Sequence, residues 1–412
     1  MSNFTLPLGI ESLEITAQSL DNQGHIIFDV KSNRTSTTCR ICGKSIDKVH
    51  GHGELLTIQH LPILDQPVFL RIRVVRYQCM ECDDHPTTAE RYDWMERKSK
   101  TTKGFDRYIN RQLIHSTVED VAKKEKVSYE IIESALHRLV KTNVDWTQYT
   151  NLETLGIDEI ALRKGHNEYV VIVSAKNKKG DLSVIGVLPN RLKETVKSFL
   201  ESIPESLRKT VNSICTDMCD SFVQSACEIF GERVVIIDRY HVSKLYREPL
   251  DKLRISEMKR LKKELSSEEY AKLNNMMWIV RKKYECLSHT EKDQLNLLYK
   301  HSLKLKEMHR AALKLTHIFN THQSRKVAFT KLNRWIDFVQ KSGLSGFDGF
   351  IKTLTKYKST ILNYFKSRKN SGFVEGLNNK IKVLKRRCYG VFKTETLFQR
   401  LFLDLKGYEM FA

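Results

Sequence analysis

The sequence has few residues that break secondary structure and no long apolar run. Glycine (18) and proline (7) are scarce among 412 residues, which excludes collagen-like and linker-rich proteins. No stretch without a charged residue exceeds ten residues, and this is too short for a helix that spans a bilayer. The first ten residues also lack a basic segment followed by an apolar one. We therefore expect a cytoplasmic protein with no membrane partner.

Acidic residues are in deficit. The chain has 69 Lys and Arg against 49 Asp and Glu, a net charge of +20, which is more than solubility requires. The excess favours a polyanionic partner, with nucleic acid ahead of an acidic membrane surface. The hydrophobic share of 41% and the charged share of 29% are typical of a folded chain.

Four of the nine cysteines form two closely spaced pairs, Cys39-Arg-Ile-Cys42 and Cys79-Met-Glu-Cys82. Each spacing lets both thiolates reach one ion, and four thiolates complete the shell of a structural Zn²⁺. A β-branched and aromatic run at 70–78 reads as a strand that enters the second pair. The alternative, two disulfides, is disfavoured in a cytoplasmic protein. We therefore expect a zinc ribbon.

Residues 116–141 carry two apolar stripes at helical spacing, separated by a short break at 125–128. Two short helices joined by a tight turn fit a helix-turn-helix, whose second helix enters the major groove of DNA. An ordinary helical hairpin would have the same periodicity. The basic flanks and the zinc ribbon favour DNA contact, and we expect Arg138 and Lys141 to take part.

The central region alternates strands and helices. Expected strands lie at 155–162, 168–175, 181–188, 211–216 and 233–237, and expected helices at 191–203 and 221–230. This order predicts a mixed α/β sheet covered by helices. From 239 to 340 the sequence is charged, with apolar residues every three or four positions, so we expect a long helical insertion.

Acidic residues occupy informative places in this sheet. Asp158 lies inside an apolar strand, and Asp217 and Asp238 each follow one. Acids at strand ends converge on one edge of an open sheet, where sites form. The alternatives are a helix N-cap for Asp217 and a turn or edge position for Asp158.

One further acid is isolated in a basic stretch. Residues 349–394 contain 12 Lys and Arg and a single acid, Glu375. As a helix, this segment would bury Val374, Leu377, Ile381 and Leu384. A carboxylate there makes sense as a metal ligand, although the local sequence alone slightly favours a Glu that caps the helix start or forms a salt bridge there.

Asp158, Asp217 and Glu375 can meet if the helix that carries Glu375 packs beside the strand that carries Asp158. Three such carboxylates would hold two Mg²⁺ (or Mn²⁺) ions, about 3.5–4 Å apart. Such a pair activates an attacking water or 3′-hydroxyl and stabilises the leaving oxygen at phosphorus. The hypothesis fits a phosphodiester substrate.

The motifs together resemble bacterial insertion-sequence transposases of the ISL-three family. The resemblance rests on the four cysteines, the helix pair, Gly156-Ile-Asp158-Glu with Lys164-Gly165, Thr216-Asp217-Met, Asp238-Arg-Tyr-His241, the Glu375-Gly-Leu-Asn-Asn-Lys-Ile-Lys382 segment and Arg387-Cys-Tyr-Gly390. It implies an RNase H-like core in which Asp158, Asp217 and Glu375 are catalytic, and it leaves Asp238 and His241 as accessory residues. It also implies that backbone phosphates are bound near the active site by Lys380, Lys382, Lys385, Arg386 and Arg387.

The implied domains are a zinc ribbon at 1–98, a helix-turn-helix segment at 99–150, a core at 151–243 and 349–412, and an insertion at 244–348. The implied partners are double-stranded DNA, as terminal inverted repeats and as target, and a second copy of the chain on paired ends, without a small-molecule substrate. An inactive DNA-binding regulator and a two-metal nuclease without strand joining are the alternatives. The central strands disfavour a tyrosine recombinase.

Overall fold

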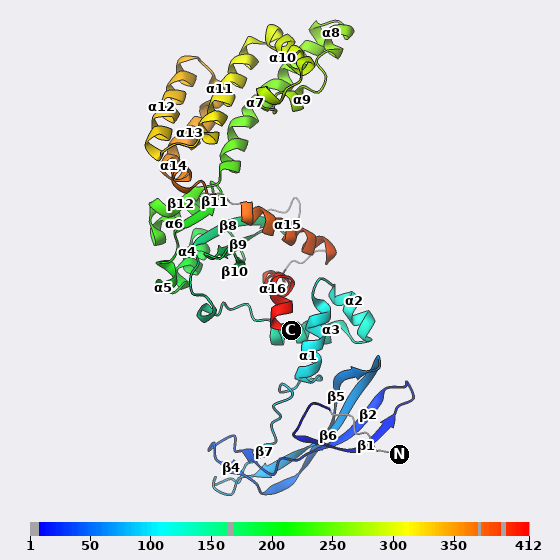
Figure 1. Ribbon diagram of the computed structural model, residues 1–412. Helices are drawn as coiled ribbons and strands as arrows, with labels where there is room; N and C mark the ends of the chain where they lie inside the picture. The colour runs from blue at the N-terminus through cyan, green and yellow to red at the C-terminus, as the bar shows by residue number, and fades with distance from the viewer. Residues whose placement is uncertain (1–7, 163–167, 370–371, 389–392, 412) are drawn as a thin grey trace. The chain divides into compact units, whose positions relative to one another are not determined.

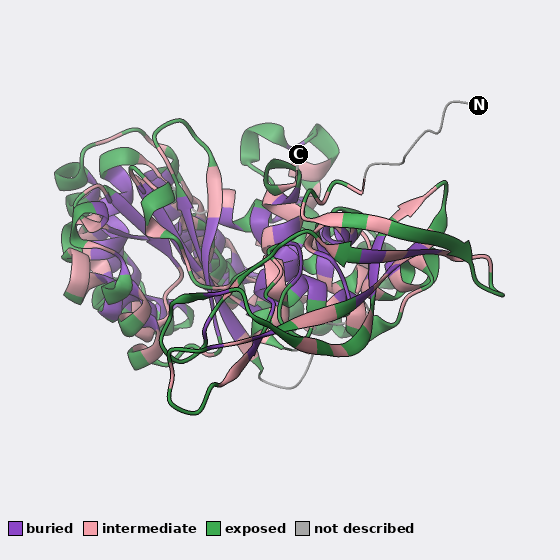
Figure 2. Cartoon of the chain, turned by 90° about the horizontal axis from the view of Figure 1, so that it is seen from below, coloured by how far each residue is buried: buried purple, intermediate pink, exposed green. Residues whose placement is uncertain are grey.

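The computed structural model describes residues 8–162, 168–369, 372–388 and 393–411. The chain forms two compact units: residues 1–143 with 382–412, and residues 144–381. The elements of each unit are drawn in Figure 1, and buried positions follow the sheets and the inner faces of the helices in Figure 2.

The first unit contains an antiparallel-rich sheet of which the sequence revealed only one strand, the run at 70–78, which is confirmed as part of β6 (Gln66–Gln78). Its strand order is β1-β2-β6-β5, with β7 beside β6, and only β2 and β6 run parallel. The long hairpin turns at Leu64 and Asp65, which both have positive φ (48° and 61°), the conformation that a two-residue hairpin turn requires. The strands are β1 (Leu13–Leu20), β2 (Ile26–Ser32), β5 (Val49–Ile63), β6 (Gln66–Gln78) and β7 (Thr87–Ala89), with a small ribbon of β3 (Thr37–Thr38) and β4 (Ser45–Ile46).

Helices α1, α2, α3 and α16 pack together in the described part of the first unit. The two predicted helices are α2 (Val118–Glu125) and α3 (Tyr129–Leu139), which pack with α1 (Lys103–Leu113). The C-terminal α16 (Thr394–Met410) joins them, because Leu403 lies in their apolar core and Arg400 donates to the carbonyl of Leu113. The expected extension of the α/β core to residue 412 stays a prediction, and α16 packs with α1 in the first unit.

The second unit is built on a mixed sheet with strand order β10-β9-β8-β11-β12. The first three strands are antiparallel, whereas β8, β11 and β12 are parallel. The predicted α/β sheet is confirmed, with bounds shifted by one or two residues. The strands are β8 (Thr154–Ala161), β9 (Tyr169–Lys176), β10 (Leu182–Leu188), β11 (Ser213–Thr216) and β12 (Val235–Ile237).

Helices pack on this sheet and extend from it. Helices α4 and α6 pack together, and α14 contacts β12. The helices that precede and follow the insertion are α4 (Lys193–Ser202), α5 (Glu205–Arg208), α6 (Asp220–Phe230), α13 (Asp348–Lys356), α14 (Lys358–Ser367) and α15 (Gly372–Arg387). Helix α15 carries residues of both units, because the division falls after Ile381.

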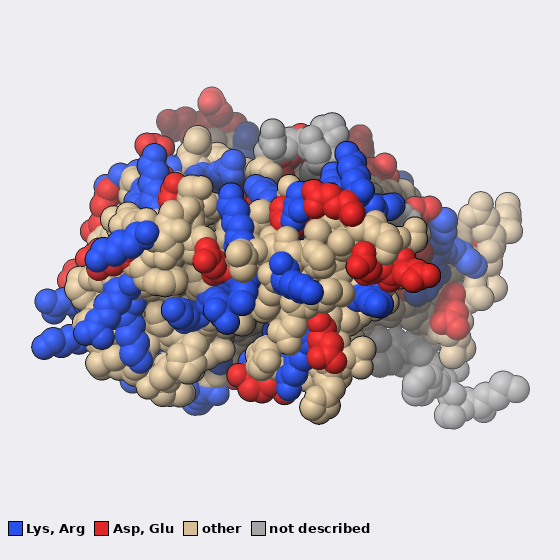
Figure 3. All heavy atoms as spheres, turned by 90° about the horizontal axis from the view of Figure 1, so that it is seen from above, with Lys and Arg blue, Asp and Glu red and all other residues tan. Residues whose placement is uncertain are grey.

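The predicted helical insertion follows β12. It shares a continuous apolar core with the sheet, in which Tyr246, Leu315 and Trp335 are buried. Lys and Arg side chains gather on the left of the face seen in Figure 3. The insertion contains α7 (Arg239–Glu264), α8 (Ser267–Ala271), α9 (Met276–Ile279), α10 (His289–His301), α11 (Leu303–Asn320) and α12 (Arg325–Lys341). Short 3-10 turns are η1 (Trp146–Gln148), η2 (Glu232–Val234), η3 (Tyr284–Cys286) and η4 (Ser345–Phe347).

No helix within the described ranges combines the length and the apolar character that crossing a bilayer would need.

Candidate active site and zinc site

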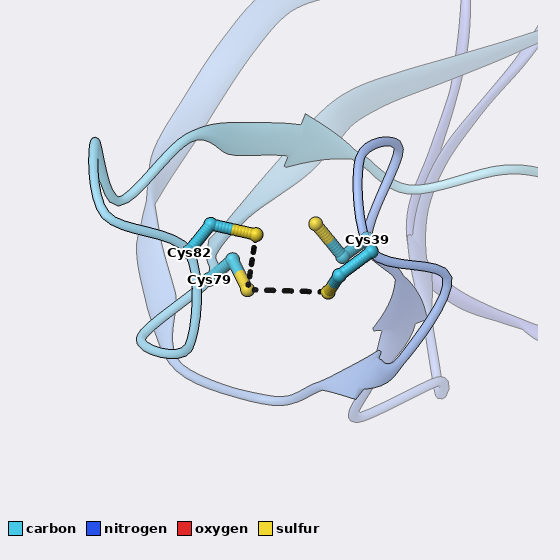
Figure 4. A group of neighbouring side chains, drawn as sticks. Cys39, Cys79 and Cys82 are labelled. Atoms are coloured by element: carbon cyan, nitrogen blue, oxygen red, sulfur yellow. Dashed lines mark hydrogen bonds between the residues drawn. The ribbon is translucent and has the colours of Figure 1, made fainter.

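The four paired cysteines come together in the first unit. Their sulfur atoms all lie within 4.8 Å of one another, and Figure 4 shows the side chains of Cys39, Cys79 and Cys82 facing a common centre. The sulfur of Cys79 lies 3.8 Å from that of Cys42 and 3.6 Å from that of Cys82. Sulfur atoms around a tetrahedral zinc ion with bonds of about 2.3 Å are separated by about 3.8 Å. The geometry therefore fits zinc.

The thiols of this group differ in acidity, because burial and the neighbouring cysteines raise the pKa of Cys82 to about 12. All nine cysteines are free thiols, so the disulfide alternative is not formed. Backbone amides of Cys42 and Ile41 lower the pKa of Cys39 to about 6 by donating to its sulfur. The thiolate is the form that binds metal. These cysteines thus form a structural zinc site of the ribbon type.

Asp158 and Asp217 are neighbours toward the carboxyl ends of β8 and β11, two adjacent inner strands whose ends form one edge of the mixed sheet. Strand β11 pairs in parallel with β8, and Thr216 stands opposite Ile157. The next residue along each strand is one of the two acids, and paired strands lie about 4.8 Å apart. The sequence separates these residues widely, but the strand register brings them side by side, as the apolar strands predicted.

Both acids are held in an environment that disfavours their charge. Burial raises the pKa of Asp158, although the amide of Glu159 donates to it at 2.8 Å. Burial also raises the pKa of Asp217, and the charge of Asp158 raises it further. His241 on α7 is close enough for its charge to lower the pKa of both acids. Two half-buried acids that repel each other would gain from a bound cation.

Asp238 has a structural position. Its carboxylate caps α7, accepting a hydrogen bond of 3.0 Å from the amide of Tyr240. Its side chain is buried, at 6% exposure. Asp217, by contrast, precedes α6 without capping it: the N-cap is Cys219, whose amide donates to Asp217 at 2.9 Å. The alternative role as a helix N-cap, considered for Asp217, is therefore filled by Asp238.

Glu375 lies in the first turn of α15 and is exposed. The apolar stripe predicted for this helix is confirmed, because Val374, Leu377, Ile381 and Leu384 are all buried. Among the described residues, only the cysteine quartet brings three or more ligand atoms together at metal spacing. The convergence of all three carboxylates thus stays a prediction.

Helix α15 nevertheless contacts the acidic edge directly. The side-chain amide of Asn378 donates to Oδ2 of Asp158 at 2.5 Å, and its own oxygen has no hydrogen-bond partner among the described residues. Asn378 is 8% exposed and was not among the residues predicted for the site. Its spacing could have revealed it. A helix buries positions i, i+3, i+4 and i+7 on one face, and Asn378 is four residues after Val374.

A glycine allows this close approach. A Cβ atom on Gly156 would lie 2.3 Å from Cγ2 of Val374 and 3.0 Å from the ring of Phe373. Gly156 precedes Asp158 by two residues on β8, so both side chains face the same side of the sheet. The first turns of α15 thus rest on β8 at Gly156 and at Asp158, and Glu375 lies between these two contacts along the helix.

The residues predicted to bind DNA have unequal surroundings. Lys380, Lys382 and Arg386 are exposed on α15, and Lys141 is exposed after α3. Lys385 is half-buried, and burial lowers its pKa. Arg387 pairs with Asp404. Arg138 donates twice to the buried Asp106, at 2.6 and 2.7 Å, so its guanidinium is engaged within the fold.

The motif residues Lys164, Gly165, Tyr389 and Gly390 lie outside the described residues.

The described features define a class of protein. A cysteine-quartet zinc site, a helix pair and a strongly basic chain accompany a mixed sheet with two adjoining acids, a combination suited to handling DNA. A family model described as "Transposase" matches residues 155–401. Models for the helix-turn-helix domain of transposase family ISL3 and for a transposase zinc finger match residues 90–140 and 35–82. The chain belongs to the ISL3 family of transposases.

Two curated relatives agree with this assignment. The chain is 24% identical to the transposase for insertion sequence element IS1001 of Bordetella parapertussis, over 88% of this chain and 87% of the relative. It is 20% identical to the transposase for insertion sequence element IS1557 of Mycobacterium tuberculosis, over 97% and 93%. The similarity therefore extends through both units.

Proposed function

We propose that the protein cleaves DNA at the terminal inverted repeats of an insertion sequence and joins the freed 3′ ends to target DNA. Asp158, Asp217 and Glu375 are the catalytic acids of this proposal. The observation that carries it is the hydrogen bond from Asn378 to Asp158, because it holds the helix of Glu375 against the edge where Asp158 and Asp217 adjoin. The strand order β10-β9-β8-β11-β12 supports an RNase H-like core.

The acids are suited to divalent cations. Mg²⁺ or Mn²⁺ prefers carboxylate oxygens, and a cation would offset the burial and repulsion that raise the pKa of Asp158 and Asp217. When bound, such ions activate the attacking water or 3′-hydroxyl and stabilise the leaving oxygen. Asp158 and Asp217 would hold them from the sheet, and Glu375, whose side chain is exposed, would close the site from α15.

The remaining parts bind and position DNA. The zinc ribbon and the helix-turn-helix read the repeats, while Lys380, Lys382 and Arg386 bind backbone phosphates, contacts that carry little sequence information. Since both ends must be processed together, the active form is a dimer on paired ends. A DNA substrate places the protein on the nucleoid in the bacterial cytoplasm.

The test is a cleavage and strand-joining assay with purified protein, Mg²⁺ and DNA that carries the element's own ends. Asp158→Asn, Asp217→Asn and Glu375→Gln should each abolish both reactions while repeat binding persists. Asp238→Asn is the matched control, because Asn caps a helix as well as Asp does, and it should retain activity.

Two outcomes would overturn the assignment. Loss of activity in Asp238→Asn but not in Asp217→Asn would move the second ligand to Asp238. Binding without cleavage by the unmodified protein, in Mn²⁺ as well, would favour an inactive DNA-binding regulator. Light scattering with end DNA tests the dimer, and a protein that stays monomeric on paired ends would refute it.

A further inference from the structure

A hollow of about 730 Å³ lies in the helical insertion, between α11, α12 and the turn η3. Its floor includes Trp335, which is 3% exposed and donates its indole N–H to the carbonyl of Ala311. This indole is satisfied within the fold and serves as packing. The volume is typical of pockets that hold small organic ligands. It suits one or a few nucleotide units and is too small for a duplex.

The rim of this hollow is basic. Lys283, Lys314, Lys331 and Arg334 line it, and Glu285 is the single acid among its lining residues. None of these four cations forms an ion pair with a described residue. Two cations next to Lys283 in the sequence are paired instead: Arg281 bonds Asp251, and Lys282 bonds Glu291 at 2.5 Å. Four unpaired charges at one rim complement an anionic ligand.

Two aromatic rings stand exposed at the same rim. Tyr284 is 48% exposed and Phe338 is 39% exposed. The ammonium of Lys314 lies 4.1 Å from the centre of the Phe338 ring, and that of Lys292 lies 5.3 Å from the Tyr284 ring. Exposed rings beside cations are the arrangement that binds single-stranded nucleic acid, in which bases stack on rings and phosphates meet cations.

We infer that this hollow binds unpaired nucleotides of the DNA substrate. In a duplex, each base is covered by its neighbours, so the rings of Tyr284 and Phe338 would have no face to stack on except at an end. The substrate assignment rests on the proposed function, in which strand cleavage creates free ends. The insertion thus carries a second DNA site, which recognises single DNA strands by their exposed bases.

The experiment measures binding of a fluorescent single-stranded oligonucleotide and of a duplex of equal length to the full chain. Asp158→Asn serves as the background, so that cleavage does not interfere. Phe338→Ala should weaken single-strand binding about 5- to 150-fold, the range for loss of one stacked base, and leave duplex binding unchanged. Phe329→Ala is the matched control: its ring lies on the same helix, is 45% exposed and has Lys358 over it, but it does not line the hollow.

A second pair of variants tests the charges. Lys331→Ser should lower single-strand affinity and its salt dependence, whereas Lys326→Ser, outside the hollow on the same helix, should not. Equal weakening of single-strand and duplex binding would overturn the inference in favour of a phosphate-only surface. Competition by free nucleoside monophosphate at micromolar concentration would overturn it in favour of a mononucleotide pocket. Equal effects of Phe338→Ala and Phe329→Ala would also overturn the inference, because Phe329 does not line the hollow. Because this assay needs no cleavage, its result is separate from that of the catalytic test.

Discussion

Asn378 donates a hydrogen bond of 2.5 Å to Asp158, a residue 220 positions earlier in the chain. The bond joins a helix to the central strand of the mixed sheet and fixes one oxygen of an acid that adjoins Asp217. Partners that orient a metal-binding carboxylate in this way control its ligand geometry. Asn378 is therefore a positioning residue in the proposed reaction.

Asn378→Ala should lower cleavage by about 10- to 100-fold, the usual cost of losing a partner that orients a ligand. The buried oxygen of Asp158 would lose its donor and its fixed direction. The measurement is cleavage rate against Mn²⁺ concentration, together with the Mn²⁺ affinity of the DNA-free protein. Asn379→Ala, at the exposed neighbouring position, should match the unmodified protein. Equal losses in both variants would show a general defect of α15 instead.

Gly156→Ala should disturb the same contact from the strand side. The added Cβ would meet Val374 at 2.3 Å, and forced overpacking of this kind costs about 1–3 kcal/mol. We expect a lower melting temperature and reduced cleavage, with both partly restored by adding Val374→Ala. The control is Gly376→Ala, where a Cβ meets nothing within 4 Å and a helix gains roughly 0.5–1 kcal/mol. An unchanged Gly156→Ala protein would mean that α15 does not rest on this glycine.

The placement of Asp158 and Asp217 can largely be predicted from the sequence, because a run of apolar residues identifies a strand without reference to distant residues. The runs around Asp158 and before Asp217 define strands, and parallel pairing brings their ends together. The role of Arg138 depends on a long-range contact: its partner Asp106 is 32 residues away on α1, a helix that the sequence analysis did not define. A basic residue near a helix-turn-helix therefore looked available for DNA.

Apart from the strand at 70–78, the first sheet escaped prediction for a different reason. Strand β5 has three register shifts against β6, and its exposed and buried residues do not alternate cleanly. A pattern of period two is the main sequence signal of a half-buried strand, and bulges interrupt it. The packing of α16 on α1 also joins residues that are far apart in the sequence, as Arg400 and Leu113 are by 287 positions, which local periodicity cannot indicate.

Removal of zinc should unfold the region around the four cysteines. Structural zinc sites contribute directly to folding, and Cys79 is fully buried within the quartet. We expect one zinc per chain by a colorimetric chelator assay, and loss of zinc and of repeat binding in Cys79→Ser. Cys286→Ser, an exposed cysteine outside the quartet, should keep both. Retention of zinc by Cys79→Ser would contradict the assigned ligand set.

The helical insertion should become less stable in acid because of His309. This side chain is 2% exposed and lies 2.6 Å from the hydroxyl of Tyr299, and burial lowers its pKa to about 4. The fold therefore prefers the neutral imidazole. The stability it contributes is complete above pH about 6.5 and is lost as the pH falls toward 4.

At pH 5 this loss should be roughly 2 kcal/mol, from the difference between the folded and the ordinary pKa. Hydrogen exchange of α10 and α11 at pH 7.5 and pH 5, corrected for intrinsic exchange, measures it locally. His309→Gln should remove most of the pH dependence, because Gln does not titrate, whereas the exposed His289→Gln on α10 should leave it intact. If His309→Gln and the unmodified protein lost protection equally, protonation of other groups would explain the acid sensitivity.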